Sequence, residues 1–296
     1  MILRDHGDHR RDSPVTFGTG RPCLRHLVGF PALLVLALGW PGTHLEGQEA
    51  PRLPEPAFED NSFFVEEAYN QATRVVQHIN GLWLAGERLE NLFYTFTQEW
   101  PLGGPRHQLS YTIPLTRLAG QSLSIGDVQL NYRYQLLEGE RWSIAPRLTL
   151  ILPSGSVAKS LGFGTVGGQF NLPVSFRFSR QFVTHWNAGL TFLPRASASN
   201  GDIHRGLVNY NLGASVVGPL MWPVQFLLEG VVNFASVIDS TGDVRHGTAG
   251  VVSPGIRVAI NVGKLQIVPG LGVPVLIAEG TSRVGLFSYL SFEHPF

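Results

Sequence analysis

The feature that most constrains the fold is a strict alternation of apolar and polar side chains. In Asp127–Leu137 (DVQLNYRYQLL) every second residue is apolar, and polar residues such as Arg133 fill the gaps. An amphipathic helix would space its apolar residues three and four apart, so the pattern predicts a β-strand with two different faces. In a soluble sandwich the apolar face would point into a core. In a membrane barrel it would point outward into lipid, and the polar face would line a lumen.

The alternation recurs to the end of the chain and predicts a sheet of about twelve strands, with ten or fourteen as the alternatives. The expected strands are 74–84, 91–100, 106–116, 126–137, 141–153, 166–179, 182–193, 206–217, 222–235, 249–261, 264–277 and 284–296. Connections of two to four residues, such as 180–181, alternate with longer polar ones at 154–165, 194–205 and 236–248. Tight turns on one rim and longer loops on the other are typical of a transmembrane barrel. The predicted fold class is therefore an all-β antiparallel transmembrane β-barrel, and prolines inside its strands are expected at bulges or near the rims.

Composition agrees with a membrane protein and excludes several function classes. Charged residues make up 15% of the 296 residues, against roughly 25% in soluble domains, and basic and acidic residues balance at 22 each. A net charge of zero gives no reason to expect a nucleic-acid partner. The most apolar internal stretch, 215–235, contains Pro219, Pro223 and Glu229, so it is interpreted as two strands around a turn rather than as a membrane helix.

The N-terminus is interpreted as an export signal. Several arginines precede an apolar run at 27–40, which is about the length of a signal-peptide core and short for a membrane span. We expect a signal peptide within residues 1–50, cleaved near 42–50, with a stop-transfer anchor as the alternative. The single cysteine, Cys23, precedes the apolar run, which disfavours a lipoprotein.

The C-terminus, GLFSYLSFEHPF, ends in an aromatic residue that shares a strand face with Phe292. This pattern resembles the signal by which outer-membrane strands are recognised for insertion, so Phe292 and Phe296 are the predicted insertion signal. We expect a bacterial outer-membrane location, with outer-membrane lipid and the barrel-insertion machinery as partners. The sequence does not predict the oligomeric state.

Four stretches carry a family resemblance: NSFFVEEAYNQATRVVQHI (61–79), GDVQLNYRYQLL (126–137), PRLTLILPSGS (146–156) and LGFGTVGGQF and its continuation (161–192). They resemble the outer-membrane transporters grouped under the MetA pathway of phenol degradation. The resemblance implies a β-barrel of about a dozen strands that passes small molecules, aromatic or otherwise hydrophobic. It supplies no site residues.

Polar residues on the predicted inward faces are the candidates for lining and selectivity. They are Arg133, Arg147, Arg177, Glu229, Arg257, Asn131 and Asn187. One interpretation is a mildly basic pore that attracts anions or contacts aromatic rings through cation–π interactions. The other is that these side chains pair with acidic groups and fill the lumen, because a twelve-stranded barrel is intermediate between filled and open barrels.

Residues 51–73 precede the first expected strand and contain Glu66 and Glu67. These carboxylates are plug candidates that would form salt bridges to the lumen arginines. The alternative is a solvated periplasmic lead-in. The expected domain organisation is thus a signal peptide, this lead-in or plug, and a barrel over 74–296.

Nothing in the sequence has the pattern of an enzyme. A Gly-x-Ser-x-Gly motif and metal-ligand spacings are absent, and the glycine-rich stretch 162–168 leads into a strand rather than a helix. We predict a channel or transporter for small molecules that needs no cofactor and no metal and is not an enzyme. The alternatives are a closed structural or surface-interaction barrel and an outer-membrane enzyme that acts on lipid.

Overall fold

A computed structural model describes residues 60–86, 88–198, 203–239 and 241–296. The expected signal peptide and its cleavage site lie outside the described residues, as do Cys23 and residues 51–59. Within the described ranges, no helix is long and apolar enough to cross a membrane.

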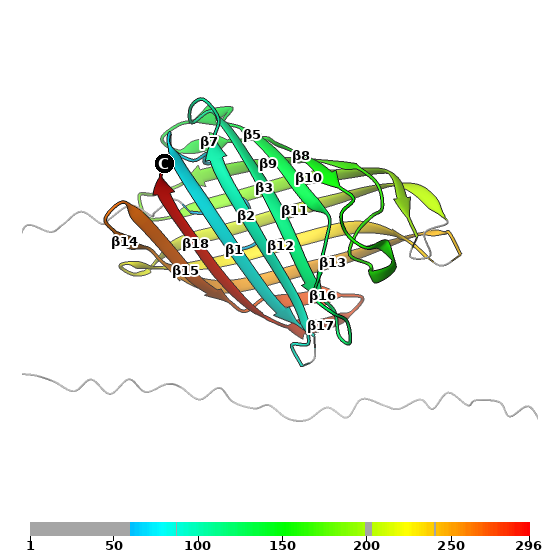
Figure 1. Cartoon of the computed structure of the whole chain (residues 1–296). Helices are drawn as coiled ribbons and strands as arrows, with labels where there is room; N and C mark the ends of the chain where they lie inside the picture. Colours follow the sequence, from blue (N-terminus) through cyan, green and yellow to red (C-terminus); the bar gives the residue numbers. More distant parts are fainter. Residues whose placement is uncertain (1–59, 87, 199–202, 240) are drawn as a thin grey trace, which may run out of the picture. The chain divides into compact units, whose positions relative to one another are not determined.

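Eighteen β-segments form one antiparallel sheet in the described chain (Figure 1). In chain order they are β1 (Val75–Ala85), β2 (Asn91–Pro101), β3 (His107–Arg117), β4 (Ser124–Ile125), β5 (Val128–Tyr134), β6 (Leu137–Glu138), β7 (Trp142–Ile144), β8 (Arg147–Leu152), β9 (Gly167–Arg177), β10 (Val183–Ser197), β11 (His204–Met221), β12 (Val224–Ile238), β13 (Val244–Val258), β14 (Ile260–Val262), β15 (Leu265–Gly272), β16 (Val275–Ala278), β17 (Thr281–Val284) and β18 (Leu286–Pro295). Short breaks separate segments of one crossing. β4–β6, β7–β8, β13–β14, β15–β16 and β17–β18 each cross the barrel once, so the crossings number twelve.

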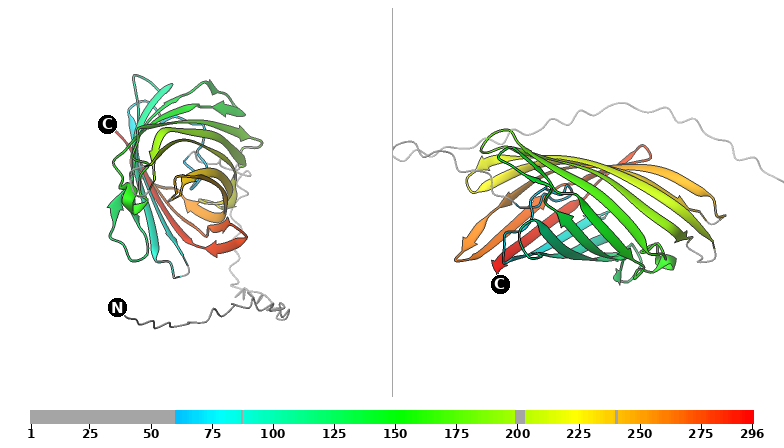
Figure 2. Two further views of the ribbon diagram at one scale, coloured as in Figure 1. Left: turned by 90° about the vertical axis from the view of Figure 1, so that its right-hand side faces the viewer. Right: turned by 90° about the horizontal axis from the view of Figure 1, so that it is seen from above.

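The sheet closes on itself because its first and last strands are hydrogen-bonded neighbours. β1 pairs with β18 from Val75↔Pro295 to Leu84↔Leu286, and with β2 along its other edge. The resulting ring is seen most directly in the left view of Figure 2. The closed twelve-stranded barrel confirms the predicted fold class. We call the rim where β1 begins and β18 ends the terminal rim, and the opposite one the distal rim.

The apolar faces of the strands point outward. In β5, the strand with which the sequence analysis begins, Leu130 is 45% exposed, whereas Asn131 and Arg133 are 3% and 2% exposed. In β8, Leu148 and Leu150 are exposed and Thr149 between them is buried. A belt of large apolar side chains on the outside of a closed barrel is a lipid-facing surface, since water would make it costly.

Aromatic rings gather on the outer face near the terminal rim. His78 stacks on Phe292 at 4.7 Å between ring centroids, and Trp142 lies 4.4 Å from Phe176. Such girdles sit where hydrocarbon gives way to headgroups. The terminal rim therefore has the composition of a membrane–water interface.

Strands extend into two of the long connections expected from the sequence. β10 continues to Ser197 and β11 starts at His204, while β12 and β13 pair out to Ile238↔Val244. These stretches are polar and therefore resemble loops in sequence, but their backbones remain paired beyond the apolar belt. The long connection that remains is 153–166, which contains the short 3-10 helix η1 (Val157–Lys159).

Prolines within the strands coincide with breaks in the neighbouring crossing. Pro146 lies in the break between β7 and β8, and Pro173 of β9 lies opposite that break, where its carbonyl accepts from Ala145 N at 3.2 Å. Pro254 of β13 similarly faces the break between β15 and β16 and accepts from Val273 N at 2.9 Å. Because proline has no N–H to donate, the ladder is interrupted where it sits.

The outward face predicts a depth-dependent effect of charge. We expect Leu212→Arg, in the middle of β11, to lower the free energy of unfolding in lipid vesicles by about 2–4 kcal/mol. Leu220→Arg, on the same face near the terminal rim, should cost about 0–1 kcal/mol, because its guanidinium reaches the headgroups. Urea titration in vesicles measures both values. Equal costs at the two positions would contradict a lipid-facing strand.

Candidate functional site

The lumen of the barrel contains residues Asp60–Gln71, which we call the inner segment. They form no strand or helix, and their hydrogen bonds reach inward side chains of nine strands, from β1 to β18. The segment thus traverses the inside of the barrel on its way to β1. Since an extended backbone removed from water needs hydrogen-bond partners, the important question is what satisfies it.

Glu229 of β12 meets this need for three consecutive amides. Its Oε2 accepts from Phe63 N at 3.1 Å, and its Oε1 accepts from Phe64 N at 3.0 Å and Val65 N at 3.1 Å. The side chain is 2% exposed. A carboxylate buried in this way is stabilised by donors that converge on it, so it and the segment hold one another in place.

Further inward side chains continue the same recognition along the segment. The Asn187 carboxamide accepts from Glu66 N and donates to Glu66 O, both at 2.7 Å. The next partners are Ser175 Oγ for Ala68 N, Gln135 Oε1 for Asn70 N and Gln108 Oε1 for Gln71 N, at 2.7–2.9 Å. The barrel wall therefore binds the segment mainly through its backbone.

Two lumen arginines bind carbonyl groups of the segment. Arg133 donates to Tyr69 O at 2.7 Å and to Glu67 O at 3.2 Å. Arg257 donates to Asp60 O and Asn61 O at 2.5 and 2.8 Å. Both guanidinium groups are almost fully buried, so they face the segment rather than open lumen.

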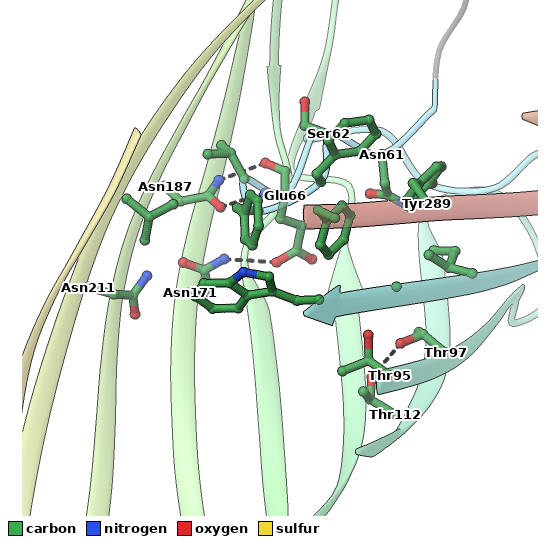
Figure 3. Close-up of a pocket in the computed structure, with 18 of the residues that line it drawn as sticks. Asn61, Ser62, Glu66, Thr95, Thr97, Thr112, Asn171, Asn187, Asn211 and Tyr289 are labelled. Carbon is green, nitrogen blue, oxygen red and sulfur yellow. Dashed lines mark hydrogen bonds between the residues drawn. The ribbon is translucent and has the colours of Figure 1, made fainter. Parts of the chain in front are cut away.

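The Glu66 side chain joins the segment to two arginines of the wall. Its carboxylate lies 3.1 Å from Arg133 Nη1 and 3.3 Å from Arg147 Nε, and it accepts from Asn171 Nδ2 at 2.8 Å (Figure 3). Arg133 also lies 3.7 Å from Glu99. The structure thus brings Glu66, Arg133 and Arg147 together in one ionic cluster.

Asp60 anchors the start of the segment near the terminal rim. Its carboxylate accepts from Gln77 Nε2 at 2.7 Å, Tyr289 OH at 3.0 Å and Ser291 Oγ at 2.9 Å. Burial raises the pKa of the Asp60 carboxyl above its ordinary value, and the neighbouring Arg257 opposes this shift.

Phe63 docks where the wall has no side chains. A Cβ atom at Gly255 or Gly270 would lie 2.5 or 2.7 Å from the Phe63 ring, so only glycine leaves room for it. The ring also lies 5.3 Å from the rings of Phe287 and Tyr289. Inward glycines of β13 and β15 are therefore part of the docking site.

A serine, a histidine and a glutamate meet beneath the segment but do not form an accessible catalytic group. His185 Nδ1 is 2.7 Å from Ser175 Oγ, and its Nε2 is 3.8 Å from Glu67 Oε2. Both Ser175 and His185 are fully buried, and Tyr69 packs edge-on against the imidazole. A substrate could not reach the serine, so the group holds the segment in place.

On the distal side of the inner segment lies a cavity of about 490 Å³, which we call the inner chamber (Figure 3). Aromatic rings from β1, β2 and β18 line one side, namely Trp83, Phe93 and Phe287. Carboxamides from β9–β12 line the other, among them Asn171, Asn187 and Asn211.

A second cavity of about 430 Å³, the outer chamber, lies under the connection 153–166, and Phe93 borders both chambers. Its lining is mostly apolar and includes Ile151, Leu161 and Leu207. Asp127 fixes the connection by accepting from Gly155 N at 2.9 Å and Phe163 N at 2.8 Å. The two chambers therefore adjoin each other at Phe93.

The remaining predicted site residues have other surroundings. Asn131 links Ser110 and Thr149 within the wall, and Arg177 lies 5.9 Å from the Tyr69 ring centre. Phe292 and Phe296 lie on and just after β18, and their role in insertion stays a prediction. Gln108, Gln135 and Ser175 also bind the inner segment, although the sequence analysis did not single them out. The alternation of apolar and polar residues could have identified them, because they occupy its inward positions. No local pattern reveals Asp60 or Phe63.

Comparison with known proteins finds solved structures of similar fold. No family model matches the chain, and no curated protein matches it. The structure is similar to the COG4313 outer membrane channel from Pseudomonas putida F1, with a TM-score of 0.54 and 10% identity over 81% of this chain and all of that one. It is also similar to the NanC porin, with a TM-score of 0.51 and 9% identity over 75% of this chain and all of that one. At these identities the likeness establishes the fold alone.

The Glu229 contacts predict how the segment is loosened. We expect Glu229→Gln to increase hydrogen exchange at the amides of Phe63, Phe64 and Val65 by about tenfold or more, because an amide offers one acceptor atom and no charge to three donors. Mass spectrometry of the exchanged protein measures this. Glu138→Gln, at an exposed position of β6, is the matched control and should change nothing there. Unaltered protection in Glu229→Gln would show that the carboxylate does not hold the segment.

Proposed function

We propose that the protein is a passive channel for small molecules in the bacterial outer membrane. The observation that carries this proposal is the pair of chambers that adjoin at Phe93 inside a barrel whose outer surface is apolar. A solute entering at the distal rim would meet the outer chamber, then the inner chamber, then the inner segment. The similarity in fold to the COG4313 channel and the NanC porin supports the proposal.

We further propose that the inner segment is the plug considered in the sequence analysis. Its contacts occupy the arginines that would otherwise give the lumen a positive charge, and they span the barrel between the inner chamber and the terminal rim. A solute can pass only if the segment shifts or is displaced. Selectivity in this scheme depends on lumen width and lining, as in other pores.

The mostly apolar outer chamber supports a cargo of small aromatic or otherwise hydrophobic molecules, as the resemblance to the MetA-pathway transporters implies. Membership of that family is part of the proposal. So are contacts with outer-membrane lipid and recognition of Phe292 and Phe296 by the insertion machinery. The protein acts on its solute without cofactor or covalent chemistry.

A closed structural barrel is the second candidate, and the density of contacts around the inner segment favours it. The segment's amides donate hydrogen bonds to five wall side chains, namely Glu229, Asn187, Ser175, Gln135 and Gln108. If these contacts never open, the barrel does not conduct. The two candidates therefore differ in a single measurable property.

Deletion of residues 60–72 tests both. In planar bilayers the deleted chain should show a single-channel conductance several times that of the full chain, because the lumen is then unobstructed. A second variant, Phe63→Ala with Glu66→Gln, keeps the chain length and should also raise conductance by weakening the docking. Heat-modifiable migration in gels establishes that each variant is a folded barrel.

Unchanged conductance in both folded variants would contradict the plug. Failure of the full chain and of both variants to conduct or to release a small dye from proteoliposomes would contradict the channel and favour the closed barrel.

A further inference from the structure

The inner chamber has two chemically different walls that face each other across the barrel. Counted around the ring, β1, β2 and β18 lie opposite β9, β10 and β11. The first group contributes the rings of Trp83, Phe93 and Phe287, and the second contributes side-chain amides. A solute in the chamber therefore meets an apolar surface on one side and hydrogen-bonding groups on the other.

Some of these polar groups are not used by the protein itself. Asn171 and Asn187 are bound to Glu66, but within the described chain no hydrogen bond engages the carboxamides of Asn211 and Asn233. Asn233 is exposed to the chamber. A carboxamide both donates and accepts hydrogen bonds, so these groups suit the hydroxyl groups of a ligand.

The charges that border the chamber are already compensated. Glu66 is paired with Arg133 and Arg147, and Glu99 accepts from Gln108 and lies near Arg133. A charged solute would lose its hydration without gaining a free counter-ion, unless it broke this cluster. The chamber should therefore discriminate against ions.

We propose that the inner chamber is a binding site for uncharged ring compounds that carry hydroxyl groups at one edge, with Asn211 and Asn233 as the groups that recognise those hydroxyls. The ring lies against Trp83, Phe93 and Phe287. Aromatic alcohols and monosaccharides share this chemistry, since both present an apolar face and a hydroxylated edge. As a route for transport the site rests on the proposed function, but binding to it can be measured without conduction.

Calorimetric titration of the full chain in detergent, corrected with empty micelles, tests the site with four probes. Benzyl alcohol and methyl glucoside represent the two sources of the shared chemistry. Benzoate keeps the ring and adds a charge, and toluene keeps the ring and lacks the hydroxyl. We expect at least one hydroxylated probe to bind, and benzoate to bind about tenfold more weakly than benzyl alcohol or not at all.

The double variant Asn211→Leu with Asn233→Leu assigns the polar edge. It should lower the affinity for the hydroxylated probe by about tenfold and change the affinity for toluene by no more than about twofold, because only the hydroxylated probe loses hydrogen bonds. Gln129→Met, the same kind of change in the outer chamber, is the matched control and should leave all four affinities unchanged.

Binding of benzyl alcohol alone would identify the source as aromatic alcohols, and binding of methyl glucoside alone would identify it as sugars; either supports the site. Measurable binding of benzoate with the same affinity as benzyl alcohol, absence of binding by both hydroxylated probes, or a double variant whose affinity for toluene falls as much as its affinity for the hydroxylated probe would overturn it. Each of these results leaves the conductance of the channel as a separate question.

Discussion

Hydrocarbon cannot hydrogen-bond a peptide group, and every other property of this structure follows from that constraint. The pairing of β1 with β18 removes the last open sheet edge, so each strand can present apolar side chains to lipid while its backbone is satisfied by its neighbours. Closure also reverses the arrangement found in soluble proteins, because the apolar side chains lie outside and the polar side chains lie inside. The polar residues are enclosed, and a lumen that contains arginines and glutamates needs something to compensate them.

The inner segment provides that compensation and is itself stabilised by it. Its backbone has no strand to pair with, so the carboxylate of Glu229, the amide of Asn187 and the guanidinium groups of Arg133 and Arg257 take the place of a neighbouring strand. Buried charges are tolerated because each faces donors or an opposite charge. Lining and filling are therefore not alternatives here. The same side chains line the lumen and bind the chain that occupies it, and two chambers remain on its distal side.

The sequence predicts the strands of the barrel wall much better than it predicts the position of the inner segment. Alternation assigns Leu130 to lipid and Arg133 to the lumen because a period of two is a local property of a strand. The stretches 194–205 and 236–248 look like loops because polarity alone does not distinguish a loop from a strand that has left the membrane. Docking of Phe63 against Gly255 and Gly270 joins residues about two hundred positions apart, and no local pattern encodes such a contact. The pairing of Glu66 is predictable from the sequence because a carboxylate next to a lumen that contains arginines has opposite charges to pair with.

The central claim is that the segment before β1 lies inside a barrel whose apolar face is outside. A Cβ atom at Gly213 would lie 3.3 Å from Val65 Cγ2, so cysteines at these positions are close enough for a disulfide. In a chain with Cys23 replaced by serine and refolded in lipid vesicles, Val65→Cys with Gly213→Cys should form the cross-link under mild oxidation. Val65→Cys with Leu212→Cys, one residue along β11 but on the outer face, should not. Cross-linking to position 212 but not to 213, or recovery of the protein without lipid or detergent as a soluble compact monomer, would contradict the account.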